Sequence, residues 1–284
     1  MWRTLPVMLV VSGCAADTVV VSGPHDRYAM THQGIPASNA DARAFGLDLD
    51  GDGKLDNQFG MALGAAAGPG YADFQAASDR LLQASQVIAL VDLQAANTLG
   101  PTADAWTVFL GTKSGATYET DPVSPSTVPL SGSIADKLST VGPGDLVIPV
   151  GLFGTPGRLR LVGAHATFVA NNREMHGIIG GGIPATEVMD TILPAGAAMF
   201  QQKIASDCEA GAPPPDCGCP MGSPAASMIR EFDPDHDCVI TVDDLLATSW
   251  LNAVLAPDVT IDGQHALSFG ISFDATWFET VPAS

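Results

Sequence analysis

The stretch Ala266-Leu-Ser-Phe-Gly-Ile-Ser-Phe-Asp-Ala-Thr-Trp-Phe278 alternates large apolar residues with small or polar ones. Successive side chains of a β-strand point to opposite faces, so this alternation separates two sets of side chains. The apolar set is Leu267, Phe269, Ile271 and Phe273, and the other set is Ser268, Gly270, Ser272 and Asp274. The pattern predicts a strand near the end of the chain that closes an antiparallel β-sheet.

Segments upstream supply the rest of the predicted sheet and its helices. Strands are predicted at residues 28–35, 87–93, 106–111, 145–153, 158–169 and 174–183. Helices are predicted at residues 40–45, 58–67 and 71–86, followed by a long helix from Thr186 toward Cys208 that Pro194 kinks. Residues 115–128, rich in Ser, Thr and Pro, are predicted to form a surface loop. We therefore expect an α+β fold, with an antiparallel, sandwich-like β-sheet core and packed helices.

An Asp-rich loop lies at residues 46–60. Its carboxylates occupy positions 1, 3, 5 and 9 of a tight turn and belong to Asp48, Asp50, Asp52 and Asp56. Gly53 stands at position 6, where a calcium loop needs a positive φ, and Lys54 offers its backbone carbonyl at position 7. Hard oxygen ligands gathered in this way favour Ca2+ over the alternative, a solvated Asp-Gly turn. Position 12 is Phe59 rather than Glu, so the loop is EF-hand-like or dockerin-like.

A second Asp-rich loop lies at residues 233–244. Its expected ligands, at positions 1, 3, 5, 7, 9 and 12, are Asp233, Asp235, Asp237, Val239 (carbonyl), Thr241 and Asp244. Position 6 is Cys238, which brings a side chain to a turn that usually holds glycine. Helices predicted at residues 223–232 and 242–255 flank this loop, so we expect a C-terminal EF-hand-like helix-loop-helix.

The cysteines predict disulfides and export. After Cys14, four cysteines remain: Cys208, Cys217, Cys219 and Cys238. An even number in an exported chain predicts two disulfides, and a bridge between Cys217 and Cys219 would close a very small, strained ring. Cys208 should therefore pair with one of these two and Cys238 with the other. The alternative is a four-cysteine zinc site, for which the C-x-C spacing is unusual.

The N-terminus predicts a lipid anchor. Residues 1–13 have one Arg and a short apolar run typical of a signal peptide, and Val11-Ser12-Gly13-Cys14 matches a lipobox. The alternative is an ordinary signal peptide followed by a chance cysteine. Lipidation of Cys14, followed by Ala15 rather than Asp, would place the protein at the outer membrane or cell surface. No other apolar run approaches the roughly 20 residues of a membrane helix.

These motifs divide the chain into segments. Residues 14–27 form a flexible tether, and residues 28–207 an α+β domain with the first Asp-rich loop. Residues 208–256 form a disulfide-tied, EF-hand-like segment, and residues 257–284 the strand that completes the sheet. The chain has 12 Lys and Arg against 31 Asp and Glu, a net charge of −19. That charge argues against binding to nucleic acid or anionic lipid surfaces, so the membrane contact is expected through the anchor alone.

No catalytic residues are expected. The sequence has no G-x-S-x-G or H-E-x-x-H motif, and its six histidines are scattered. We therefore expect a calcium-binding cell-envelope lipoprotein that is structural or presents a ligand and is not an enzyme. One alternative is an apolar-ligand or lipid carrier, which would need an apolar pocket. The other is a hydrolase of envelope polymers, which would need paired carboxylates in a polar cleft. The sequence names no protein or glycan partner.

Several motifs together resemble one family. They are the loop at 46–60, Asp-Cys-Gly-Cys at 216–219, the loop with Cys238, Leu255-Ala-Pro-Asp-Val259 and the Leu-Ser-Phe-Gly of the last strand. In this order they resemble secreted lipoproteins of gram-negative soil bacteria, without an assigned activity, that carry EF-hand-like or dockerin-like calcium loops. The resemblance covers most of residues 28–278. It implies calcium-ligand roles for the loop residues named above and implies no reaction.

Overall fold

The computed structural model describes residues 21–67, 73–125, 128–215 and 217–279. The predicted signal peptide, Cys14 and the first part of the tether lie outside these residues. The described chain begins its first strand, β1 (His25–Gly34), three residues before the strand expected at 28–35.

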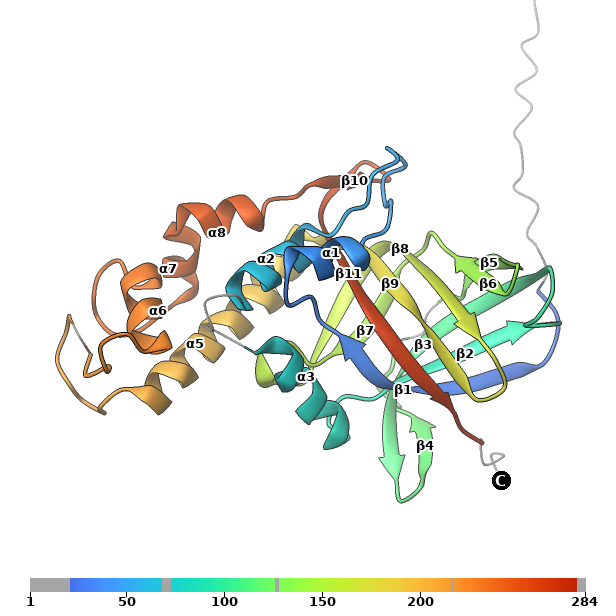
Figure 1. The fold of residues 1–284 in the computed structure, drawn as a ribbon, viewed down its shortest axis with the longest axis horizontal. Coiled ribbons are helices and arrows are strands. Elements are labelled where there is room, and N and C mark those ends of the chain that lie inside the picture. Colours follow the sequence, from blue (N-terminus) through green and yellow to red (C-terminus); the bar gives the residue numbers. More distant parts are fainter. Residues whose placement is uncertain (1–20, 68–72, 126–127, 216, 280–284) are drawn as a thin grey trace, which may run out of the picture.

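Eight antiparallel strands close into a barrel (Figure 1). In spatial order they are β1, β2 (Ala89–Ala95), β3 (Thr102–Ser114), β5 (Leu130–Ala135), β6 (Leu138–Val141), β8 (Gly157–Ala170), β9 (Glu174–Pro184) and β11 (Gln264–Trp277). The ring closes because β11 also pairs with β1, from Tyr28 opposite Trp277 to Gly34 opposite Ser272. Three short strands pair outside the ring: β4 (Thr117–Thr120) with β3, β7 (Leu146–Val150) with β8, and β10 (Val259–Ile261) with β11.

The expected α+β fold with a sandwich-like sheet is therefore wrong. The sheet bends until its first and last strands meet, and short helices add a smaller part beside it. Bulges between Met30 and His32 in β1 and between Val162 and His165 in β8 bend the strands. Gly163, inside the second bulge, has a φ of 54°. Side-chain alternation predicts which residues face inward, but it carries no information on whether a sheet closes.

The barrel interior holds the apolar face of β11. Leu267, Phe269, Ile271 and Phe273 are at most 1% exposed, as the alternation predicted. The ring centroid of Trp106 on β3 lies 6.0 Å from that of Phe273. Ser268 on the other face is also buried, because the start of α2 (Gln58–Ala67) covers it and the backbone N–H of Gln58 donates to its hydroxyl. Residues 266–270 of β11 are thus enclosed on both faces.

The helices gather beside one end of the barrel (Figure 1). Besides α2 they are α1 (Asn39–Ala44), α3 (Phe74–Gln83), η1 (Leu152–Gly154), α4 (Ala185–Glu187), η2 (Val188–Ile192), α5 (Leu193–Asp207), α6 (Pro224–Phe232), α7 (Val242–Ala247) and α8 (Ser249–Val254). The helix predicted at 58–67 is confirmed. The long helix deviates through the π-helical turn η2, just before Pro194, and Thr248 breaks the helix predicted at 242–255. The loop expected at 115–128 contains β4, and the sequence analysis missed the hairpin of β5 and β6.

Candidate metal centres

The first Asp-rich loop connects α1 with α2. An antiparallel bridge between Leu47 and Asp56 joins its two ends, with the Asp56 N–H donating to the Leu47 carbonyl at 2.9 Å. Inside the loop, the carboxylate of Asp48 accepts the N–H groups of Gly51 at 2.8 Å and Gly53 at 3.0 Å. Gly53 has a φ of 84°, which confirms the expected use of glycine at position 6. The loop is therefore folded around the carboxylate at position 1.

Three carboxylates of this loop converge. Oxygens of Asp48, Asp50 and Asp56 lie within 4.8 Å of one another, and the triad could hold a metal ion. Asp52 instead forms an ion pair with Lys54, whose hydrogen bond lowers the pKa of that carboxyl. Burial raises the pKa of Asp56, and the negative charge of Asp50 adds to the rise, although a hydrogen bond from the Leu49 N–H opposes it. A bound cation would relieve this repulsion between neighbouring carboxylates.

The second Asp-rich loop lies between α6 and α7. Asp233 is fully buried, and its carboxylate accepts the N–H groups of Asp237 at 3.1 Å and Cys238 at 2.9 Å. Oxygens of Asp233, Asp235 and Asp237 lie within 4.8 Å of one another, so this triad too could hold a metal ion. A side-chain hydrogen bond with Asp233 raises the pKa of Asp235, and the nearby Asp244 contributes to the rise.

The two loops share two positive-φ positions and two hydrogen bonds. Position 4 has a positive φ in both, 79° at Gly51 and 58° at His236, and so has position 6, 84° at Gly53 and 73° at Cys238. In both, position 1 accepts the N–H of position 6, and position 5 accepts the N–H of position 7, the residue expected to give a carbonyl. These positive-φ values and hydrogen bonds are thus common to both loops, although position 6 holds different residues.

Two predicted ligands of the second loop have a different role. The Asp244 carboxylate accepts the N–H of Thr241 at 2.8 Å and its hydroxyl, while the Thr241 hydroxyl accepts the N–H of Asp244. This reciprocal pair is a capping box that begins α7. The structure therefore places Thr241 and Asp244 at the helix start, outside the triad.

Two disulfides hold the segment around the second loop. Cys208 pairs with Cys219, and Cys217 pairs with Cys238. This confirms the prediction that Cys208 and Cys238 each pair with one cysteine of the C-x-C motif, and it shows which one each takes. The second bridge fastens position 6 of the loop. The side chain of Gln201 on α5 adds a further link, because it accepts the N–H of Ile240 at 3.1 Å and donates to the Cys238 carbonyl at 3.4 Å.

The sequence analysis missed a residue that links the first loop to the barrel. Asn57 directly follows the loop and is 4% exposed. Its amide donates to Gly270 O and accepts from Gly270 N, each at 2.9 Å, and it also donates to the Ala42 carbonyl. The Asn57 side chain thus joins the loop to the outside of β11. In the sequence, this role of Asn57 is indicated only by the presence of a polar residue between the Asp-rich loop and an apolar helix.

Comparison with protein-family models finds no matching family, and neither curated proteins nor solved structures give a match to this chain. The disulfides indicate an exported protein, because such bonds persist in oxidising compartments. Within the described residues, no helix combines the length and apolar character needed to cross a membrane.

Proposed function

We propose that the protein is a calcium-binding lipoprotein of the cell envelope with a structural or ligand-presenting role and no catalytic activity. The observation that carries the proposal is the convergence of three carboxylates in each of the two Asp-rich loops. Each wraps backbone N–H groups around the carboxylate at position 1 and brings three carboxylates within 4.8 Å. The converging carboxylates are at positions 1, 3 and 9 of the first loop and at positions 1, 3 and 5 of the second, in separate parts of the fold.

The donor set favours Ca2+ among common cations. Both triads offer carboxylate oxygens alone, without His or Cys, which suits a hard cation. Ca2+ accepts six to eight oxygens in adaptable geometry, so backbone carbonyls and water can complete the sphere, whereas Mg2+ requires a near-ideal octahedron. The first loop is attached to β11 through Asn57, and the second joins α6 to α7. Calcium at the first site would therefore stabilise the attachment of that loop to the barrel, and calcium at the second would stabilise the junction of α6 with α7.

The other elements of the proposal rest on sequence. Lipidation at Cys14 would hold the protein at the outer membrane or cell surface, in agreement with the disulfides. The mixed cleft of about 510 Å3 beside β7 contains one carboxylate, that of Asp121, among its lining residues. Retaining and inverting glycosidases use two carboxylates, so this cleft alone does not have the lining that the hydrolase alternative needs.

Titration calorimetry of EDTA-treated protein tests the calcium sites. We expect two binding events, of which Asp48→Asn removes one and Asp233→Asn the other. Asp190→Asn, which neutralises an exposed carboxylate outside both loops, is the matched control and should leave both events intact. At 100 times Kd, each site should raise the free energy of unfolding by about 2.7 kcal/mol. Absence of binding heat and of any thermal shift at millimolar Ca2+ would refute the proposal.

A further inference from the structure

One end of the barrel lies opposite the helices and is formed by three turns between strands (Figure 1). They are residues 96–101 between β2 and β3, residues 136–137 between β5 and β6, and residues 171–173 between β8 and β9. The chain enters β1 at the same end, where the N–H of Ala95, the last residue of β2, donates to the Pro24 carbonyl. We call this surface the turn face.

The predicted lipid anchor attaches close to the turn face. Cys14 lies outside the described residues, and the described chain begins at residue 21. A fully extended backbone between these two positions spans at most about 25 Å, whatever conformation the connecting residues take. Lipidation at Cys14 would therefore hold the turn face within about this distance of the bilayer surface.

Each of the three turns has a large apolar side chain exposed to solvent in it or beside it. Leu99, in the first turn, is 64% exposed, and Leu138, directly after the second, is 45% exposed. Trp277 is 42% exposed beside the third turn, where its backbone N–H donates to the Arg173 carbonyl at 2.7 Å. Leucine gains free energy on leaving water, and tryptophan is enriched at membrane–water interfaces. These side chains are thus suited to contact with a bilayer.

The acidic charge of the chain is concentrated away from the turn face. The three turns, the starts of β1 and β9 and the end of the described chain are nearly balanced, with Arg27, Lys137 and Arg173 against Asp26, Asp136, Glu174 and Glu279. The first Asp-rich loop has four Asp and one Lys, and Asn57 attaches it at Gly270. Gly270 lies about 23 Å from Trp277 along β11. Because screening limits repulsion to about 8 Å at physiological ionic strength, the net charge of the chain does not exclude contact between this face and an anionic bilayer.

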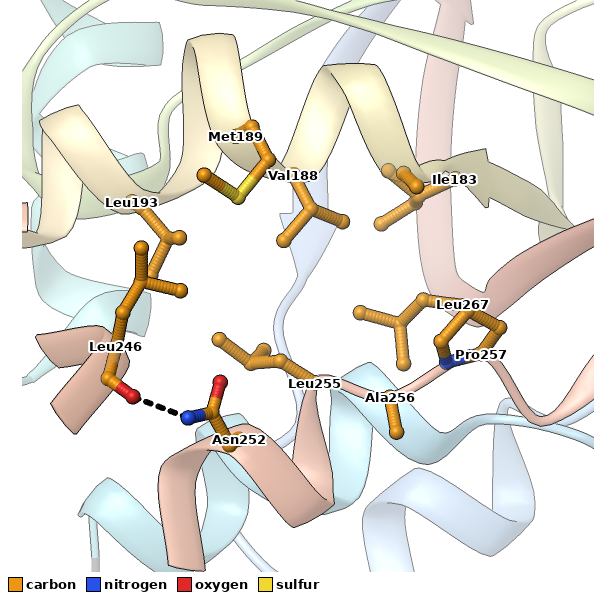
Figure 2. A pocket seen from close by; sticks show the side chains of 11 residues that line it. Ile183, Val188, Met189, Leu193, Leu246, Asn252, Leu255, Ala256, Pro257 and Leu267 are labelled. Carbon is orange, nitrogen blue, oxygen red and sulfur yellow. Dashed lines mark hydrogen bonds between the residues drawn. The ribbon is translucent and has the colours of Figure 1, made fainter. Parts of the chain in front are cut away.

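Another apolar surface lies at the opposite end of the barrel. Figure 2 shows a groove in which Met189 on η2 and Leu255 lie on opposite walls. Ile183 and Leu267, at the barrel side of this groove, belong to the end of β9 and the start of β11. The groove is therefore separated from the turn face by the length of these strands. Met189 is 43% exposed, so it provides a matched control for an exposed apolar residue of the turn face.

We propose that the turn face rests on the lipid bilayer, with Leu99, Leu138 and Trp277 inserted at the level of the headgroups and the adjoining acyl chains. The inference rests on the proposed lipidation, because the anchor brings this face to the membrane. It adds an orientation that an anchor alone does not give. The helices and both Asp-rich loops would point away from the bilayer, so a ligand-presenting role would use the helical part.

Fluorescence quenching by brominated lipid tests this contact on the acylated full chain. Leu99→Trp, Leu138→Trp and the control Met189→Trp each add one tryptophan at an exposed apolar position. Each variant is reconstituted into vesicles of phosphatidylethanolamine and phosphatidylglycerol, with and without bromine on the acyl chains. The emission added by the tryptophan at position 99 or 138 should fall at least about twofold in the brominated vesicles, because these side chains reach the acyl region. The emission added at position 189 should stay unchanged.

The outcomes separate contact of the turn face from anchoring. Absence of quenching at positions 99 and 138, or equal quenching at position 189, would overturn the proposal. Mass spectrometry of the reconstituted protein shows whether Cys14 is acylated. An acylated, vesicle-bound protein without quenching refutes the contact alone, whereas a protein without an acyl group that does not bind the vesicles refutes both the contact and the lipoprotein proposal. A melting temperature equal to that of the wild type shows that each variant is folded.

Discussion

Loss of the Cys217–Cys238 bridge should weaken calcium binding at the second Asp-rich loop and leave the first loop unaffected. Cys238 holds a φ of 73°, a left-handed conformation that costs a non-glycine residue about 1–2 kcal/mol. The bridge fixes this turn, whose N–H at position 6 donates to Asp233. In Cys217→Ser the turn can relax, and recovering its shape before binding should lower the affinity about 5–30-fold.

The same variant should also lower stability. The bridge joins residues 21 positions apart, and closing a loop of that length is worth about 3.4 kcal/mol in the chain-entropy account. The double variant Cys217→Ser/Cys238→Gly loses the same bridge but removes the cost of the positive φ. It should therefore recover much of the calcium affinity without recovering the full stability.

Calorimetry in two backgrounds measures each loop separately. Asp48→Asn removes calcium binding at the first loop, so the remaining heat measures the affinity of the second. Asp233→Asn removes binding at the second loop, so the remaining heat measures the affinity of the first. The first loop contains no cysteine, so its affinity should be the same with and without the bridge. Equal weakening of both loops would mean that the whole fold had loosened, and unchanged affinity of the second would show that Cys238 needs no bridge; either result refutes the reasoning.

Three further predictions concern the anchor, a buried acid and the link to the barrel. A fatty-acid probe should label the wild-type protein and miss Cys14→Ser; equal labelling would reject the lipobox. Burial raises the pKa of Asp104, so stability should fall as pH rises from the unfolded value of about 3.9 through the folded pKa. Asp104→Asn should make that fall in stability shallower in denaturant unfolding between pH 4 and 7, because the raised pKa values of Asp56 and Asp235 also contribute to it, and an unchanged slope would contradict this. Asn57→Ala removes the hydrogen-bond partner of both backbone groups of Gly270 and should lower the free energy of unfolding by about 2–5 kcal/mol. Urea unfolding measures this change, and the control Gln58→Ala should change the free energy of unfolding little.

The sequence predicts local structure well where one short pattern determines it. The alternation of Leu267 and Phe269 in the last strand gives the correct inward face, and ring strain at Cys217 and Cys219 gives the correct partition of disulfides. Glycine at position 53 correctly predicts a turn with positive φ. Each of these inferences depends on residues that are neighbours in the sequence or on chemistry that permits few alternatives.

The sequence analysis fails where distant or unusual backbone features decide the outcome. The bulge between Met30 and His32 in β1 contributes to barrel closure and leaves no mark on the alternation. In the turn between β5 and β6, Asp136 and Lys137 have positive φ. Hairpin turns with this conformation usually contain glycine, and this one contains none, so the sequence does not indicate it. For Thr241 a signal existed: a threonine with an acidic residue three positions later indicates a capping box.

The pairing of β1 with β11 also determines when the barrel can form. The hydrogen bond from Thr31 to the Asp274 carbonyl spans 243 residues of sequence, so the closing contact must wait for almost the entire chain. Non-local pairing of this kind slows folding. Until β11 pairs with its two neighbours, β1 and β9 each have an edge with unpaired N–H and C=O groups, which can pair with another chain. A chain that stops before residue 264 would therefore form an open sheet prone to association.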